Sequence, residues 1–361
     1  MTPITTGAVS VYVIPTDGLE SDGTLEWTST TIVVVEVAAG GVSGLGYTYG
    51  HKASAVLIAD MLLPIVRDHD AMDISGAWIA MTRAIRNQGR PGIASMSIAA
   101  VDAALWDLKA RLLKVPLVTL LGQAREEVPV YGSGGFTSYS VDRLQQQLAG
   151  WVERGISRVK MKVGRAPEED DLRVRLAREA IGPEPSLFVD ANGAYTRKQA
   201  MVHAETFAAA NVTWFEEPVS SDDLEGLRLI RDRAPSGMDI AAGEYGYDLY
   251  YFRRMLDAGA VDVLQADATR CAGITGFLQV GQLCDAYNVP LSSHTASALH
   301  VHPCCALGRV RHVELFYDHE RIERMLFDGA PEPASGMLRP DVSRPGLGLE
   351  LKRADASRYA A

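Results

Sequence analysis

From Val128 onward, short apolar runs alternate with amphipathic segments that have the spacing of helices. The runs read VPVYGSGG, RVKMKVG, SLFVDANGAY, VTWFEEPV, MDIAAGEY, VDVLQAD, VPLSSHT and RHVELFY. Segments such as SVDRLQQQLAGWVERG and RKQAMVHAETFAAA lie between them and predict helices. Repeated β–α units indicate an α/β fold with a parallel sheet. Eight of them favour a TIM-type barrel over an open doubly wound sheet.

The pattern before Val128 is different. GAVSVYVIPTDG and STTIVVVEVAAGG predict strands, and VSGLGYTYG predicts a further strand or turn. In SMSIAAVDAALWDLKARLL, apolar residues recur at helical spacing. We therefore predict an α+β domain over residues 1–125 and a barrel over 126–326. The Pro- and Gly-rich segment 327–361 should pack back on the first domain.

Composition narrows the classes of partner. The chain has 361 residues and a net charge of -10, which argues against a nucleic-acid surface or an anionic membrane as partner. No apolar run approaches a membrane span, and the N-terminus lacks a basic stretch followed by an apolar core. The four cysteines, two of them adjacent, suit a reducing compartment. We expect a cytoplasmic protein that forms a homo-oligomer.

Almost every predicted barrel strand carries an ionisable side chain at or near its end. In strand order these are Lys160 and Lys162, Asp190, Glu216 and Glu217, Glu244, Asp267, His294, and Glu314 on the eighth strand. The carboxyl ends of barrel strands meet at one rim, where active sites lie. A single such residue is usually a solvated loop residue or a charge at a helix start. The whole set indicates a catalytic site.

Three carboxylates on neighbouring strand ends predict a metal site. Asp190, Glu216 and Glu244 would repel one another and raise at least one pKa, and a hard divalent cation removes that repulsion. An all-oxygen set suits Mg²⁺. The segment HVHPCC is a competing zinc motif, but we interpret it as part of the helix after the seventh strand, with its cysteines in packing.

The order K-x-K, D-x-N, E-E-P, G-E, D, H, E around a barrel resembles the enolase superfamily, specifically its mandelate racemase subgroup. AAVDAALWDLKARLLKVPLVTLLG resembles the capping-domain helix of that family and the segment that follows it. The resemblance implies a modified (β/α)7β barrel with an α+β capping domain.

The resemblance also implies a role for each residue. Asp190, Glu216 and Glu244 would hold Mg²⁺, and Asn192 would touch the substrate near the metal. Lys162 would be a base on one face of the substrate, with Lys160 neutralising the substrate carboxylate. Asp267 and His294 would form a dyad on the other face, and Glu314 would bind the enolate oxygen. Lys160 and the metal should lower the pKa of Lys162, and a protonated Glu314 should help to stabilise the developing charge.

The expected reaction is Mg²⁺-dependent abstraction of the α-proton of a small-molecule carboxylate through an enediolate, and we favour dehydration of an acid sugar. There are two alternatives. One is a racemase or epimerase of a 2-hydroxy acid, and the other is a non-catalytic binding barrel. Specificity should lie in the capping-domain loops PTDGLESDGTLEW and YTYGHK, whose polar residues suit a polyhydroxylated substrate: Asp17, Glu20, Asp22, Tyr47, Tyr49 and His51. Of these, we predict Tyr47 and His51 as substrate-binding residues.

Overall fold

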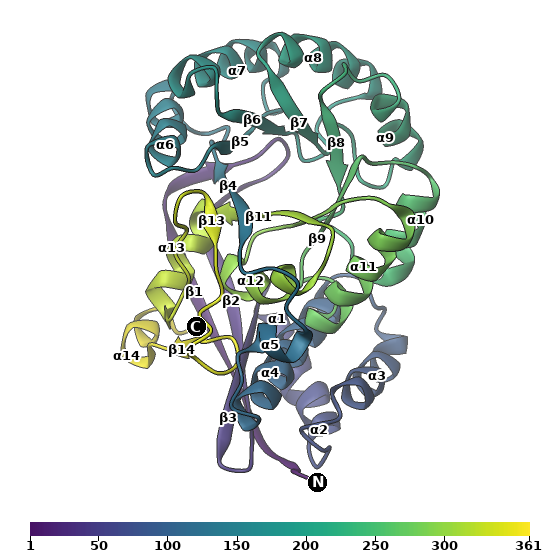
Figure 1. The fold of residues 1–361 in the computed structure, drawn as a ribbon, viewed down its shortest axis with the longest axis vertical. Coiled ribbons are helices and arrows are strands. Elements are labelled where there is room, and N and C mark those ends of the chain that lie inside the picture. The colour runs from purple at the N-terminus through teal and green to yellow at the C-terminus, as the bar shows by residue number, and fades with distance from the viewer.

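Eight parallel strands close into a barrel in the computed structural model, which describes residues 1–361 (Figure 1). The barrel strands are β4 (Val128–Gly134), β5 (Arg158–Lys162), β6 (Ser186–Asp190), β7 (Val212–Glu216), β8 (Asp239–Ala242), β9 (Val263–Ala266), β10 (Leu291–Ser293) and β11 (Val310–Phe316). They lie in sequence order, and β11 closes the ring by pairing with β4. The predicted fold class is confirmed.

A helix follows each barrel strand. These helices are α6 (Val141–Glu153), α7 (Pro167–Ile181), α8 (Arg197–Ala209), α9 (Leu224–Arg231), α10 (Leu249–Asp257), α11 (Gly273–Tyr287), α12 (Ser297–Ala306) and α13 (Tyr317–Leu326). The family resemblance implies seven β–α units and a closing strand, and the structure adds α13 after that strand. Aromatic and aliphatic side chains fill part of the barrel interior: Tyr131, Phe188, Trp214, Ala241 and Val263.

The N-terminal part combines a three-stranded antiparallel sheet with helices. Its strands are β1 (Ile4–Ser21), β2 (Glu26–Ala39) and β3 (Val42–Tyr49), in the order β1-β2-β3. Its helices are α1 (Ala53–Leu57), the π-helix η1 (Ile58–Leu62), α2 (Leu63–Val66), α3 (Ile74–Ala84), the 3₁₀-helix η2 (Ile85–Asn87), α4 (Ile93–Leu112) and α5 (Leu117–Leu121). Sheet and helices share a core of aliphatic residues that includes Val35, Ile98 and Leu105.

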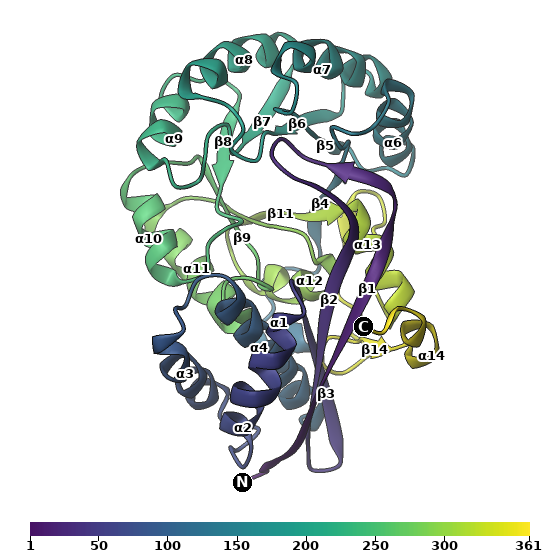
Figure 2. The ribbon, with the colours of Figure 1, turned by 180° about the vertical axis from the view of Figure 1, so that it is seen from behind.

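The β1–β2 hairpin reaches from this sheet to the mouth of the barrel (Figure 2). The sequence predicts residues 15–27 as a loop. The structure instead continues β1 to Ser21 and starts β2 at Glu26, with a register shift between Pro15 and Glu20. The hairpin tip packs tightly, since a Cβ on Gly23 would lie 2.3 Å from the carbonyl oxygen of Ala191, just past β6. This close approach requires glycine and holds the hairpin over the strand ends.

The C-terminal segment contacts both parts of the molecule. It contains β12 (Phe327–Asp328), β13 (Met337–Leu338), β14 (Glu350–Leu351), α14 (Arg353–Ala356) and the 3₁₀-helix η3 (Ser357–Tyr359). β13 pairs antiparallel with barrel strand β4, and β12 pairs with β14. Arg353 forms an ion pair of 2.6 Å with Glu36 on β2, and the amide of Ala361 donates to the carbonyl of Val11. The domain boundaries stay a prediction.

Crossing a bilayer would need a longer and more apolar helix than any that the structure contains. All four cysteines are free thiols in buried positions.

Candidate active site

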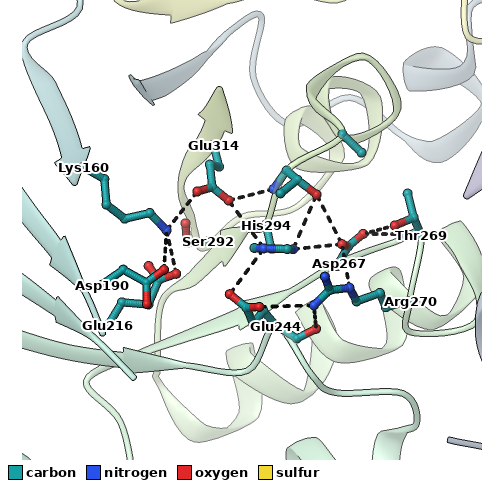
Figure 3. A network of polar contacts seen from close by, with 12 residues as sticks. Lys160, Asp190, Glu216, Glu244, Asp267, Thr269, Arg270, Ser292, His294 and Glu314 are labelled. Atoms are coloured by element: carbon teal, nitrogen blue, oxygen red, sulfur yellow. Dashed lines mark hydrogen bonds and ion pairs between the residues drawn. The ribbon is translucent and has the colours of Figure 1, made fainter. Parts of the chain in front are cut away.

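The ionisable residues of the predicted rim lie at one end of the barrel and are buried there. Lys162, Asp190 and Glu216 are the last residues of β5, β6 and β7. Glu244, Asp267 and His294 follow β8, β9 and β10, and Glu314 lies within β11. Figure 3 shows Lys160, Asp190 and Glu216 on one side of a polar network and Asp267, His294 and Arg270 on the other, with Glu244 and Glu314 between them.

The carboxylates of Asp190, Glu216 and Glu244 converge. One oxygen from each lies within 4.8 Å of the other two. Burial, followed by the charge of Asp190, raises the pKa of Glu216 well above its usual range. Such clustered, buried carboxylates are unfavourable unless cations compensate them. The donor set consists of oxygens only and fits Mg²⁺, so these three residues would hold the ion.

The two lysines already compensate part of this charge. Lys160 is fully buried, and its Nζ lies 2.6 Å from Glu216 Oε1 and 2.8 Å from Glu314 Oε1. Lys162 pairs with Asp190. Burial acts to lower the pKa of Lys162, but the charges of Asp190, Glu244 and Glu216 together outweigh it, so the protein's own groups hold that pKa above its usual range. The contribution of Lys160 is in the expected direction, downward, but is smaller.

Glu314 differs from its expected state. We predict a protonated carboxyl, but the structure favours a carboxylate. Burial acts to raise the pKa of Glu314, and the opposing charges of Lys160 and His294 lower it below its usual range. Glu314 Oε2 also accepts a hydrogen bond of 2.8 Å from the amide of Thr295. Among the protein's own groups, Glu314 is therefore an ionised partner of Lys160, and a proton on it has to come from another group during the reaction.

Asp267 and His294 form the predicted hydrogen bond, with 2.9 Å between His294 Nδ1 and Asp267 Oδ2. The other Asp267 oxygen accepts from the amide and the hydroxyl of Thr269, both at 2.7 Å. Burial acts to raise the pKa of Asp267, but the hydrogen bond and charge of His294 and the charge of Arg270 lower it below its usual range. An ionised Asp267 fixes the imidazole and leaves His294 Nε2 pointing toward Glu244, whose Oε2 lies 3.3 Å away.

The HVHPCC segment forms α12 and packs as expected. His300 Nε2 accepts a hydrogen bond of 2.8 Å from the amide of Ala268, and its Nδ1 donates to the carbonyl of Thr295. His302 accepts from the amide of Val118 and donates to the carbonyl of Leu347. Both ring nitrogens of each histidine are thus occupied by the backbone, which leaves none free to bind zinc.

A cavity of about 470 Å³ lies between the hairpin and the barrel mouth. The barrel contributes Lys162, Asn192, Glu244, Tyr245, Arg270, His294, Thr295, Phe316 and His319, and the N-terminal part contributes Asp22, Leu25, Trp27, Ser29, Thr30, Thr31, Tyr49, Gly50 and His51. Asn192 donates its amide to Asp190 Oδ1, while its own side-chain oxygen is buried without a partner. The predicted residues His51, Asn192, Lys162 and His294 thus face one space.

Tyr47 does not face this space. It is fully buried, and its hydroxyl donates to Glu323 Oε1 at 2.6 Å in the packing between β3 and α13. Tyr49, two residues further on the same strand, lines the cavity instead. Asp17 is exposed outside the lining, and Glu20 is buried behind Trp27, whose ring nitrogen donates to it. The geometry gives no support to a substrate contact by Tyr47.

Sequence reasoning missed several residues of the site. Arg270 pairs with Glu244 at 3.2 Å, and Trp214 Nε1 donates to Glu216 Oε2 at 2.9 Å. Local spacing could have found both, because Arg270 follows Asp267 by one helical turn and Trp214 shares a strand face with Glu216. Glu217, which the sequence places at the rim beside Glu216, is buried, and its Oε1 has no partner. It lines a second cavity of about 600 Å³, which shares Asn192 and Tyr245 with the first.

Comparison with known families agrees with this geometry. Residues 143–356 match the family described as enolase C-terminal domain-like. Residues 22–122 match the mandelate racemase/muconate lactonizing enzyme N-terminal domain. The chain belongs to the enolase superfamily. Within that superfamily, the N-terminal domain of the chain is of the mandelate racemase-like type.

Members of this superfamily resemble the chain over most of its length. A mandelate racemase/muconate lactonizing enzyme-like protein from Rubrobacter xylanophilus is 55% identical, with a TM-score of 0.98 and coverage of 99% of this chain and 100% of that chain. The 3,6-anhydro-alpha-L-galactonate cycloisomerase of Streptomyces coelicolor is 37% identical over 75% of both chains.

The L-talarate/galactarate dehydratase of Salmonella typhimurium is 31% identical over 90% of this chain and 81% of its own length. Its structure with Mg and L-lyxarohydroxamate has a TM-score of 0.91 and 29% identity, and covers 100% of this chain and 93% of that chain. A bound magnesium in a relative with this fold agrees with the Mg²⁺ expected for the Asp190, Glu216 and Glu244 carboxylates.

Proposed function

We propose that this chain is an Mg²⁺-dependent enzyme that removes the α-proton of an acid sugar and then expels the oxygen on the neighbouring carbon as water. The observation that carries the proposal is the convergence of three carboxylates with Lys162 and the Asp267–His294 pair around one cavity. The Salmonella relative is named as a dehydratase of such acids, and further relatives are named as arabinonate and L-rhamnonate dehydratases.

When bound, Mg²⁺ supplies positive charge where the substrate carboxylate becomes an enediolate. The protein's own groups do the rest. Lys160 lies where it can add positive charge beside that carboxylate, and a proton shared between Lys160 and Glu314 can be donated to the enolate oxygen. Asn192 offers its unpartnered side-chain oxygen to the substrate. We propose Lys162 and His294 as the proton-transfer groups.

The reaction balances without any other reactant, because the substrate loses one α-hydrogen and one hydroxyl group, which leave as water. The base takes the α-proton, and the electron pair left behind forms the enediolate. That pair then forms a carbon–carbon double bond as the β-hydroxyl leaves with a proton as water. The resulting enol tautomerises to a 2-keto-3-deoxy acid. His294 can serve both steps when proton and hydroxyl leave from one face, and Lys162 and His294 can divide them when they leave from opposite faces.

A second candidate is cycloisomerisation, which two relatives carry in their names. It starts with the same proton abstraction, but the expelled β-oxygen belongs to a ring and remains attached to the product. A racemase or epimerase would instead return a proton to the same carbon. The homo-oligomeric state and the cytoplasmic location stay predictions from the sequence.

The test is a panel of sugar acids incubated in D₂O with the Mg²⁺-loaded protein. We expect keto-acid formation from at least one acid, its loss with EDTA, and its loss in His294→Asn. Asp267→Asn should retain the fold and greatly slow the reaction, because the imidazole loses its anionic partner. Recovery of inverted, deuterated substrate without keto acid would reject dehydration in favour of racemisation or epimerisation.

A further inference from the structure

The substrate cavity has two ends of different electrical character. At the reaction end lie Lys162, Glu244 and His294, all of them charged or hydrogen-bonded to charged groups. The opposite end, which we call the distal wall, is formed by the hairpin, the end of β3 with the two residues after it, the last residue of β11 and the start of α13. Its residues are Asp22, Leu25, Trp27, Ser29, Thr30, Thr31, Tyr49, Gly50, His51, Phe316 and His319.

Fixed positive charge is confined to the reaction end. Among all lining residues, only Lys162 and Arg270 are permanently cationic side chains. The Arg270 guanidinium is engaged by Glu244 at 3.2 Å and by Asp267 at 3.6 Å. Arg165, which lies near the hairpin, is paired with Glu26 at 2.5 Å and is not part of the lining. A carboxylate at the distal wall would therefore have no arginine or lysine to pair with.

The distal wall is built from neutral hydrogen-bonding groups. The imidazole of His319 stacks on the ring of Tyr49, with 3.4 Å between ring centroids. Burial, helped by the neighbouring His294, lowers the pKa of His319 to about 3, so this ring stays neutral. Its Nδ1 has no partner within the protein. Ser29, Thr30 and Thr31 add hydroxyl groups to the same wall.

Carboxylates stand within and behind this wall. Asp22 lines the cavity and accepts hydrogen bonds of 2.7 Å from the amides of Thr24 and Leu25. Behind the wall, Asp318 accepts from the hydroxyl of Thr30 and forms an ion pair with Arg321 at 2.5 Å. Glu20 accepts from the ring nitrogen of Trp27, and burial raises the pKa of Glu20 to about 8. A second carboxylate on a substrate would thus be desolvated beside Asp22 without a lysine or arginine in the wall, whereas hydroxyl groups or a ring oxygen would find donors and acceptors.

We propose that the substrate carries one carboxylate only, bound at the reaction end, and presents a neutral polyhydroxy or ring-ether end to the distal wall. The substrate class is then the aldonic acids, open-chain or anhydro, and not the aldaric diacids. This inference rests on the proposed function.

The test compares matched acids. The Mg²⁺-loaded protein is assayed with the five- and six-carbon aldonates, each paired with the aldarate of the same configuration, and with 3,6-anhydrogalactonate. We expect the best aldonate or anhydroaldonate to exceed its matched diacid at least tenfold in kcat/KM. A smaller ratio, or a preference for the diacid, overturns the inference and leaves the proposed function standing. If no acid loses its α-hydrogen, the proposed function itself fails.

A charge placed on the wall gives an independent measurement. Leu25 lines the cavity and is 63% exposed, so the fold should tolerate Leu25→Arg, and Leu25→Gln is the matched neutral control. The ratio of kcat/KM for diacid over monoacid should rise roughly fivefold in Leu25→Arg, as expected for a partly exposed ion pair, and not in Leu25→Gln. Equal ratios in the two variants would contradict selection by the charge of this wall.

Discussion

The two ends of the substrate cavity differ in how their residues are held. At the reaction end, buried ionic groups hold one another, as in the contacts of Lys160 with Glu216 and Glu314 and of His294 with Asp267. At the distal wall, stacking and backbone contacts hold neutral groups, as in the His319–Tyr49 pair. The first end comes from barrel strand ends, and much of the second comes from the long β1–β2 hairpin.

This difference separates chemistry from selection. Paired charges on rigid strand ends keep the proton-transfer groups in place. These groups act on the carboxylate and the α-proton, which every candidate acid has. The distal wall, which has no lysine or arginine, decides which substrates fit by their remaining groups. Changes at the reaction end should therefore abolish turnover, while changes at the wall should alter preference or stability.

The largest expected effect is that of Lys162→Ala. Removing a general base typically costs about 10²- to 10⁴-fold in rate, and we expect kcat to fall in that range. The exposed Lys198 on α8 provides the matched control, and Lys198→Ala should keep wild-type kcat. Turnover of Lys162→Ala at the wild-type rate would show that His294 is the only base.

Mg²⁺ should stabilise the fold through the reaction end. An ion that binds only the folded chain adds about 2.7 kcal/mol at a hundredfold excess over Kd. Thermal melts with Mg²⁺ and with EDTA measure this. Glu216→Gln should lose most of the stabilisation because it removes a negative charge from the proposed carboxylate set, whereas Glu225→Gln, on the surface of α9, should keep it. The same Mg²⁺ effect in both variants would contradict the site.

A smaller effect should come from Glu20, behind the distal wall. Burial, followed by the charge of Asp318, raises the pKa of Glu20 from 4.5 to about 8. The folded chain therefore keeps a proton that the unfolded chain loses, and stability falls as pH rises from about 4.5 to about 8. Between pH 5 and 9, wild type should lose roughly 2 kcal/mol more than Glu20→Gln, as expected for a partly screened shift.

The control for Glu20 is Glu153→Gln, an exposed position on α6. Chemical denaturation at both pH values gives the two free energies of unfolding for each variant. If Glu20→Gln and Glu153→Gln show the same pH dependence, Glu20 is ionised in the folded chain and the distal wall carries more negative charge than described.

The reaction end could be predicted from the sequence because its signals are local. An apolar run that ends in an ionisable residue marks a strand end, and the barrel brings seven such ends together whatever the details of packing. Asp190, Glu216 and Glu244 therefore meet where the pattern indicates. The protonation of Glu314 escaped this reasoning because it depends on contacts with Lys160 and Thr295 from other strands and loops.

The distal wall was harder to predict because its signals are not local. Residues such as Pro15, Asp17 and Gly18 are typical of turns, yet β1 continues past them because it pairs with β2 on both sides of a register shift and the hairpin tip rests on the barrel. Tyr47 and Tyr49 share a strand face, and only packing against α13 near the C-terminus decides that Tyr49 lines the cavity and Tyr47 does not.

The central claim is metal-dependent abstraction of the α-proton by Lys162 and His294, and proton NMR in D₂O tests it most directly. A sugar acid that the protein converts is followed at its α-hydrogen signal with wild type and Mg²⁺, wild type and EDTA, and the double variant Lys162→Ala/His294→Asn with Mg²⁺. We predict loss of the signal in the first sample only. Loss at the wild-type rate with EDTA or in the double variant would contradict the claim.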